Sequence, residues 1–172
     1  DPTGRWLATG TVVEEPVTLP EVDDPEPPSS DRYTGELRVW NVATGEPVTD
    51  SIPVEDPVYG IQFAADGSKV AAFGTIGAEA VSSLLTSEIR VIGLPTGTPL
   101  YAPLVVNNQT VDAAFSPDGH LLATATADRF VTLWNIHTGE KTLPAVKTEN
   151  LPLHLRFSPD GWWLAAGGET EV

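Results

Sequence analysis

A repeated pair of turns, each followed or preceded by an apolar segment, constrains this chain more than any other sequence feature. A four-residue turn ends in glycine at positions 4, 67, 119 and 161. A small apolar segment follows each of these turns; the segments are Trp6-Leu7-Ala8-Thr9, Lys69-Val70-Ala71-Ala72, Leu121-Leu122-Ala123-Thr124 and Trp163-Leu164-Ala165-Ala166. A second turn, Thr-Gly, has its glycine at 45, 97 and 139 and follows an alternating polar and apolar segment. Such self-similarity indicates stacked units that bury their apolar faces against one another.

The spacing of the turns shows where the copies differ in length. From each Thr-Gly glycine to the next first-type glycine there are 22 residues in all three copies (45 to 67, 97 to 119 and 139 to 161). The extra residues therefore fall in the other half of the repeat, at about 11–34 in the first copy and 76–87 in the second. With repeat turns near 1–4, 64–67, 116–119 and 158–161, we expect residues 1–172 to form one segment of repeated units.

Each copy predicts four short strands, a to d. Strand a ends at Phe63, Phe115 or Phe157, strand b is the small-residue segment, and strand d follows the Thr-Gly turn. Strand c carries Trp40, Ile92 or Trp134. Period-two alternation, β-branched residues and flanking Gly, Pro and Asp favour strands over helices. Antiparallel four-strand units of this length predict an all-β fold, a β-propeller of four-stranded blades.

The third copy has the most informative sequence. It reads Phe115-Ser116-Pro117-Asp118-Gly119-His120-Leu121-Leu122-Ala123-Thr124-Ala125, then Asp128, then Val131-Thr132-Leu133-Trp134-Asn135. This resembles the WD-repeat β-propeller family. The Phe-Ser-Pro-Asp-Gly turns and Trp-Asn endings resemble bacterial members, which are often parts of large signalling proteins. The resemblance implies a protein-binding scaffold without catalytic activity of its own.

The resemblance also implies structural roles for four residues. Thr124, Asp128 and Trp134 are the remnants of the hydrogen-bond network that such repeats carry, and Trp40 repeats the position of Trp134. The Gly-His pair that normally precedes strand a is missing, since residues 107–109 and 148–150 stand near that place. We therefore expect apolar packing between blades to contribute more here than that network does.

The strand pattern predicts an incomplete disc. The predicted order is strands b, c and d, then two sets of a to d, then a and b, which makes about three to four blades' worth of strands. Propellers close with whole blades. We therefore expect this chain to be a segment that is open, or that is completed by further polypeptide or by another chain.

Composition excludes several classes of function. Twenty-four acidic against nine basic side chains give a formal charge of −15, which argues against nucleic acid or anionic membranes as partners. The chain has no cysteine and three histidines that lie apart in the sequence, so we expect no metal centre. No nucleophile triad, phosphate-binding loop or calcium loop is visible. We expect a cytoplasmic protein that is not an enzyme and holds no cofactor.

The two insertions predict where a protein partner binds. Loops alternate sides in an up-and-down blade, and both insertions are b–c loops, so they rise from one face together with the d–a loops. Loops on a rigid scaffold commonly carry recognition. The first insertion is acidic, with Glu14, Glu15, Asp23 and Asp24, and is either an irregular arm for a basic partner or a solvated insertion. The second, with Leu84 and Leu85, is a helix or hairpin that either contacts a partner or packs locally.

Strand a supplies the remaining candidates. Asp112 and His154 occupy equivalent positions in successive copies, and Asn108 and Asn150 precede them near the d–a loops. Asp112 and His154 either form a site at the central channel or make an inter-blade hydrogen bond that fixes blade register.

Two alternatives to a free-standing scaffold stay open. One is a sensor or regulatory propeller within a larger bacterial signalling or defence protein. The other is a small-molecule binder or an enzyme working at the channel, for which Asp112, His154 and Arg156 are the candidate polar groups.

Overall fold

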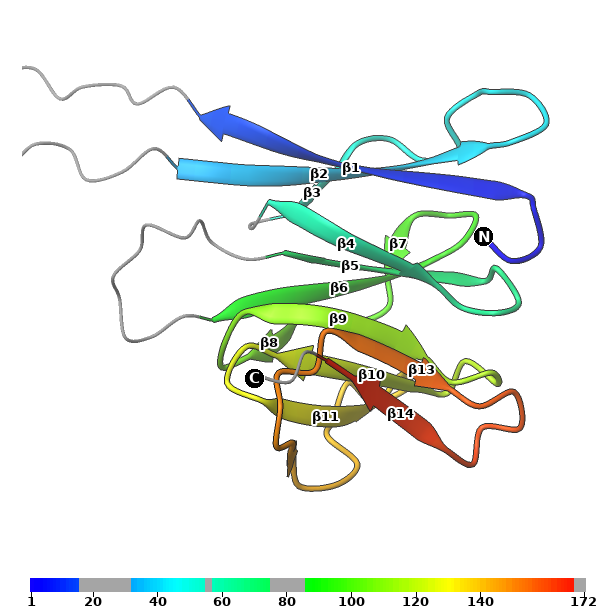
Figure 1. Cartoon of the computed structure of the whole chain (residues 1–172). Coiled ribbons are helices and arrows are strands. Elements are labelled where there is room, and N and C mark those ends of the chain that lie inside the picture. The colour runs from blue at the N-terminus through cyan, green and yellow to red at the C-terminus, as the bar shows by residue number, and fades with distance from the viewer. Residues whose placement is uncertain (16–31, 55–56, 75–85, 169–172) are drawn as a thin grey trace, which may run out of the picture.

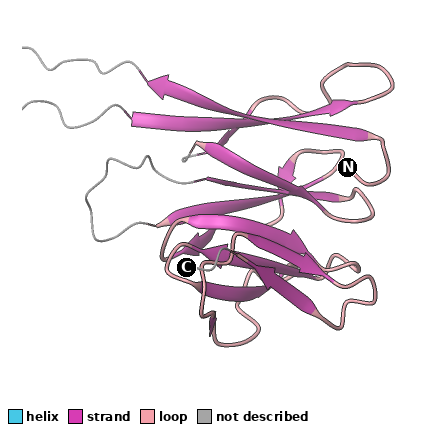
Figure 2. Ribbon diagram, in the orientation of Figure 1, coloured by secondary structure: helices cyan, strands magenta, loops and turns pink. Residues whose placement is uncertain are grey.

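The computed structural model describes residues 1–15, 32–54, 57–74 and 86–168, and every regular element in this part of the chain is a β-strand (Figures 1 and 2). The strands are β1 (Trp6–Glu15), β2 (Arg32–Asn41), β3 (Ile52–Val54), β4 (Val58–Phe63), β5 (Lys69–Gly74), β6 (Ser87–Gly93), β7 (Thr98–Pro99), β8 (Leu104–Val106), β9 (Thr110–Phe115), β10 (Leu121–Thr126), β11 (Phe130–Asn135), β12 (Val146–Lys147), β13 (His154–Phe157) and β14 (Leu164–Gly167). All pairs of neighbouring strands are antiparallel.

The strands form four successive sheets, which correspond to the predicted blades. Their orders are β1-β2-β3, then β4-β5-β6 with β7 and β8 both on β6, then β9-β10-β11-β12, and finally β13-β14. The all-β fold of an incomplete propeller is confirmed. One detail differs, because the fourth strand of the second blade is divided into β7 and β8.

The turns have the backbone geometry that glycine permits. Seven glycines have positive φ, between 67° and 75°; they are Gly4, Gly67, Gly119 and Gly161 in the first turn type and Gly45, Gly97 and Gly139 in the second. In residues with a Cβ atom this left-handed conformation is sterically disfavoured. The repeated glycines are therefore a requirement of the turns, which explains why they mark the repeat so clearly.

The core lies between the blades. One layer joins the first two blades, with Leu37 and Val39 packed against Val58 and Val70. A second layer joins the next pair and buries Phe73, Ile89, Leu122 and Trp134. A third, smaller layer packs alanines and Val131 of the third blade against Leu155. This supports the expectation that the repeats depend on apolar packing between blades.

Successive blades lie side by side, with their innermost strands in contact (Figure 1). Strand β1 contacts β4, β4 contacts β9, and β9 contacts β13. At the first of these contacts Gly10 faces Val58 so closely that a Cβ atom on Gly10 would overlap the valine side chain. Glycine at this position therefore sets how near the first two blades approach.

The first insertion differs in part from the expected irregular arm. Strands β1 and β2 pair without interruption from Trp6↔Asn41 to Glu15↔Arg32, so residues 11–15 and 32–34 belong to a long hairpin. Residues 16–31 lie outside the described part of the chain, as do 75–85 of the second insertion. Strands β1 and β5 end, and β2 and β6 begin, on the same side of the molecule (Figure 1), as the alternation of loops requires.

Candidate protein-binding surface

Two of the residues given structural roles form a buried pair. Trp134 Nε1 donates a hydrogen bond to Thr124 Oγ1 at 3.0 Å, and Thr124 is fully buried while Trp134 is 4% exposed. The first blade repeats the pair, since Trp40 Nε1 donates to Thr9 Oγ1 at 3.0 Å. Each bond ties strand b to strand c within one blade.

Asp128 takes a different partner from the one that the sequence suggests. It accepts a hydrogen bond from Thr126 Oγ1 at 2.5 Å, and the same hydroxyl also reaches the carbonyl oxygen of Phe130 at 3.2 Å. Asp128 therefore closes the turn between β10 and β11 and is separate from the Thr124–Trp134 pair. The reason is position, because Asp128 lies two residues beyond Thr126 in a tight turn.

The second blade replaces both members of the pair. Ile92 stands where the first and third blades have tryptophan, and Ala72 stands where these two blades have threonine. Both are fully buried. Without an indole N–H to satisfy, the hydroxyl is not needed, so the two substitutions are chemically consistent.

Asp112 connects the third blade to the fourth. Its Oδ2 accepts a hydrogen bond from the backbone N–H of Leu155 at 2.7 Å, and its Oδ1 accepts one from the N–H of Ala113 at 2.9 Å. The Arg156 guanidinium lies 3.5 Å from the same carboxylate. Asp112 is 8% exposed. These contacts fit the alternative in which Asp112 makes a hydrogen bond between blades. Its partner in the next blade is Leu155 rather than His154.

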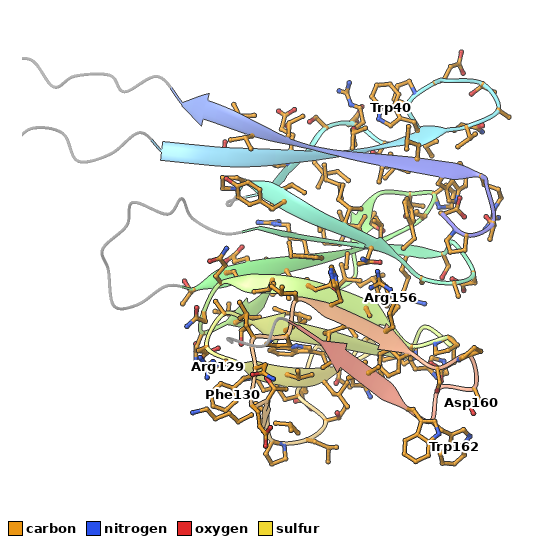
Figure 3. The ribbon with its side chains drawn as sticks, viewed as in Figure 1. Trp40, Arg129, Phe130, Arg156, Asp160 and Trp162 are labelled. Atoms are coloured by element: carbon orange, nitrogen blue, oxygen red, sulfur yellow. The ribbon has the colours of Figure 1, made fainter. Side chains whose placement is uncertain are left out.

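The other residues near the d–a loops are accessible or locally bonded. His154 and Asn150 are exposed, and the carbonyl of Asn150 accepts from Thr148 Oγ1 at 2.7 Å. The carbonyl of Asn108 accepts from Ser87 Oγ at 2.8 Å. Arg156 is exposed and labelled in Figure 3, close to the middle of the stacked blades.

Several predicted partner-binding residues lie in or beside the insertions. Glu14 and Glu15 are at the end of β1, with their Cα atoms paired to those of Tyr33 and Arg32. The others, Asp23, Asp24, Leu84 and Leu85, lie outside the described residues.

Two hollows next to the last blade were not foreseen from the sequence. One, of about 450 Å³, is lined by residues 148–152 and 166–168, at the d–a loop. The other, of about 300 Å³, is an apolar groove between β14 and the third blade, where Val131, Leu133 and Val146 face Leu164 and Ala166. Within the described part of the chain β14 pairs only with β13, so its other edge is open to the groove.

Two tryptophans lie in the turn between β13 and β14 of this last blade. Trp162 is 84% exposed and Trp163 is 75% exposed, and Figure 3 shows Trp162 pointing away from the sheets. Adjacent exposed tryptophans are unusual on a surface without a partner, because tryptophan is enriched where proteins bind one another.

Two of the histidines that lie apart in the sequence are neighbours in the structure. The rings of His120 and His137 have centroids 5.1 Å apart and planes tilted by 54°. His120 Nδ1 also lies 3.5 Å from Asp118 Oδ2. Sequence spacing did not show this contact, because it depends on two turns of one blade meeting in space.

Two other kinds of feature are absent from the described residues. Among the described residues there is no group of three or more His, Cys, Asp or Glu placed to hold a metal ion. The same part of the chain has no helix long and apolar enough to cross a membrane.

Comparison with known proteins agrees with the fold. Residues 103–135 match the family of the WD domain, G-beta repeat. The match runs from β8, the outer strand of the second blade, through β9, β10 and β11 of the third. The matched repeat thus spans two neighbouring blades and the apolar layer between them.

Two similar proteins are named periodic tryptophan protein 2 homolog. One, from Schizosaccharomyces pombe, is 26% identical over 101 residues, which cover 59% of this chain and 11% of that protein. The other, from Neurospora crassa, is 24% identical over 136 residues, covering 79% of this chain and 12% of that protein. The chain therefore spans about a tenth of the length of these curated relatives. The antiparallel sheets and the matched repeat at 103–135 confirm the resemblance to WD-repeat propellers that the sequence showed.

Proposed function

We propose that this protein is a non-catalytic scaffold that binds other proteins through the face carrying the b–c and d–a loops. The observation that carries this proposal is the position of the strand ends that the two insertions join: β1 and β5 end, and β2 and β6 begin, on one side of the blades (Figure 1). The hollow of about 450 Å³ formed by residues 148–152 and 166–168 lies at a d–a loop, which belongs to the proposed binding face. A rigid stack of blades with variable loops on one side suits recognition better than chemistry.

The charge of the chain supports a basic partner. The formal charge is −15, and Asp128 and Glu149 are exposed beside the b–c and d–a turns of the third blade. Like charges around a binding surface attract partners of opposite sign and speed their encounter. We propose a protein or peptide rich in lysine and arginine, bound in the cytoplasm.

Peptide display on the immobilised chain tests both parts of the proposal. Recovered peptides are expected to be enriched in lysine and arginine and to bind more weakly as salt rises. A variant in which a two-residue Asn-Gly turn replaces residues 16–31 keeps the β1–β2 ladder and should bind them more weakly. The matched control is Glu46→Gln with Glu140→Gln, which removes two exposed carboxylates from the Thr-Gly turns. Recovery of neutral peptides, or equal losses in both variants, would contradict the proposal.

A second candidate is a regulatory propeller within a larger signalling or defence protein. The observation that favours it is length, since the chain covers only 11% and 12% of the two relatives. A channel site is supported less well, because the carboxylate of Asp112 is occupied by the N–H groups of Ala113 and Leu155. For this reason we propose contact with other proteins rather than catalysis.

A further inference from the structure

The fold brings two particular turns of each blade together. In the first blade the N–H of Val42 donates to the carbonyl of Arg5 at 3.0 Å, and in the second the N–H of Leu94 donates to Ser68 at 2.8 Å. In the third, Ile136 donates to His120 at 2.9 Å. The same backbone bond therefore links the a–b turn to the c–d turn in each blade that has both.

The side chains next to this backbone bond differ from blade to blade. One belongs to the residue whose carbonyl accepts the bond, and the other belongs to the residue that follows the donor. The two facing positions hold Arg5 and Ala43 in the first blade and Ser68 and Pro95 in the second. In the third blade both positions hold histidine, His120 and His137. The contact between the two imidazole rings thus follows from the fold, which places these two positions side by side. Of the three blades, the third is the one in which both positions carry a side chain that can bind a metal ion.

Both histidine backbones are held in place. The N–H of His120 donates to Asp118 Oδ1 at 3.0 Å, and the N–H of His137 donates to Asn135 Oδ1 at 2.8 Å. Ser116 Oγ donates to the same Asp118 oxygen at 2.5 Å. Fixed backbones with accessible rings form a preorganised pair, because only side-chain torsions remain to be set on binding.

The separation of the rings suits a shared metal ion. A Zn²⁺–N bond of about 2.05 Å, added to the roughly 1.15 Å from a ring nitrogen to the centroid, places the ion about 3.2 Å from each centroid. Two such rings at a tetrahedral angle have centroids about 5.2 Å apart. The observed separation is 5.1 Å. The pair can therefore hold one ion with a small adjustment of the side chains.

A carboxylate supports one of the two rings. Asp118 Oδ2 lies 3.5 Å from His120 Nδ1, which leaves Nε2 of His120 as the nitrogen directed away from the aspartate. Metal-binding histidines usually place a carboxylate behind the ring in this way, which fixes the ring and raises its basicity. The Asp118 carboxylate acts from the outer shell, so the protein supplies two direct ligands.

We propose that His120 and His137 form a binding site for a divalent transition metal ion such as Zn²⁺, on the face with the a–b and c–d turns. Imidazole nitrogen favours zinc, copper and nickel over magnesium and calcium, which prefer oxygen ligands. Two protein ligands leave the other coordination positions to water or to a side chain of a bound partner. This site is independent of the proposed partner-binding face, since it lies at the opposite ends of the strands.

Titration of the untagged chain with ZnCl₂ tests the proposal, with imidazole proton shifts followed by NMR. We expect the signals of His120 and His137 to change together while those of His154 stay constant. His154 is a matched internal control, because it is exposed and is the only other histidine. MgCl₂ should change none of them.

Variants separate the ligands from the supporting carboxylate. His120→Ala and His137→Ala should each weaken zinc binding at least about tenfold, and Asp118→Asn should weaken it about tenfold through the outer shell. His154→Ala should bind zinc as the parent chain does. The proposal is wrong if the parent chain shows no change up to about 1 mM zinc. It is also wrong if His154→Ala lowers the affinity as much as the other two alanine variants.

Discussion

Tryptophan side chains at two equivalent residues differ in how far water reaches them. Trp134 is 4% exposed and donates to fully buried Thr124, whereas Trp40 is partly exposed and donates to Thr9. A buried donor that loses its acceptor is costly because no water replaces it, while a partly exposed donor can bond to solvent. The two hydrogen bonds therefore have the same length, but loss of the Thr124–Trp134 bond should lower the stability of the fold more than loss of the Thr9–Trp40 bond.

Replacing Thr124 with valine should destabilise the protein by about 1–3 kcal/mol, since the Trp134 N–H is left without a partner. The matched change Thr9→Val in the first blade should cost less. Urea unfolding followed by far-ultraviolet circular dichroism measures both. Equal losses would contradict the argument from exposure, and Thr124→Ser should restore most of the stability because it keeps the hydroxyl.

The carboxylate of Asp112 is a second residue with a defined structural role. Asp112→Ala removes the acceptor for the buried N–H of Leu155, so we expect a loss of about 1.5–3 kcal/mol. Arg156→Ala should cost less than about 1 kcal/mol, because that side chain is largely exposed and its ion pair is long. Hydrogen exchange at the Leu155 amide should accelerate in Asp112→Ala only. Similar exchange in both variants would exclude the inter-blade bond.

At the scale of elements, three of the a–b turns contain an aspartate whose carboxylate accepts hydrogen bonds within the turn. In the third blade the Ser116 hydroxyl, and then the N–H of His120, hold the pKa of Asp118 below its usual value. The Ser68 N–H and hydroxyl do the same to the pKa of Asp66. In the last blade the Ser158 hydroxyl and the Trp162 N–H lower the pKa of Asp160. Each carboxylate is thus bonded in its charged form.

The lowered pKa values of these three aspartates predict a loss of stability in acid. A carboxyl group whose pKa is lower in the folded than in the unfolded chain stabilises the fold above its unfolded pKa of about 3.9, and this contribution disappears as pH falls through the folded value. Unfolding free energy should therefore decrease below about pH 4. The triple variant of Asp66, Asp118 and Asp160 to asparagine should show a flatter decrease. An unchanged slope would show that other groups cause the acid sensitivity.

Element boundaries also show what the sequence could and could not predict. Strands b and c were predictable because their apolar patterns and glycine turns recur, four times for strand b and three times for strand c. Tyr59 alternates with Ile61 and Phe63 in the sequence of β4, yet it is 64% exposed. The register shifts between Val58 and Gly60 where β4 pairs with β5, and a bulge of this kind turns one side chain outward. The local signal for that shift is Gly60, because a glycine inside a strand often marks a bulge.

The candidate sites were predictable to a lesser degree. Asp112 was identified from its place in strand a, but its bond to Leu155 depends on how two blades stack. The contact of His120 with His137 depends on two turns that are separate in the sequence and joined by one backbone hydrogen bond. Contacts within a repeat follow from its pattern, whereas contacts between turns and between blades need the three-dimensional arrangement.

At the scale of the whole molecule, the last blade differs from the others in having two paired strands within the described residues. The groove of about 300 Å³ beside β14 and the exposed tryptophans leave an apolar surface next to an open strand edge. Such edges pair readily with another strand unless a charge or a bulge prevents it. The isolated chain should therefore associate as its concentration rises.

Sedimentation velocity over a range of concentrations measures this association. A lysine in place of Ala166, which lines the groove, should shift the chain towards monomer because it puts a charge at the edge. The control Val42→Lys makes the same charge change at an exposed position in a Thr-Gly turn of the first blade. A parent chain that stays monomeric at all concentrations would contradict the prediction, as would equal effects of the two lysine variants.

The exchange of tryptophan for Ile92 has a practical consequence for spectroscopy. The five tryptophans of the chain lie at positions 6, 40, 134, 162 and 163, so the first, third and last blades carry indole emitters and the second carries none. Intrinsic tryptophan fluorescence would report thermal unfolding of the first, third and last blades, but it would give no signal from the second blade. A single tryptophan introduced at Tyr101, next to the second blade's outer strands, would supply the missing reporter.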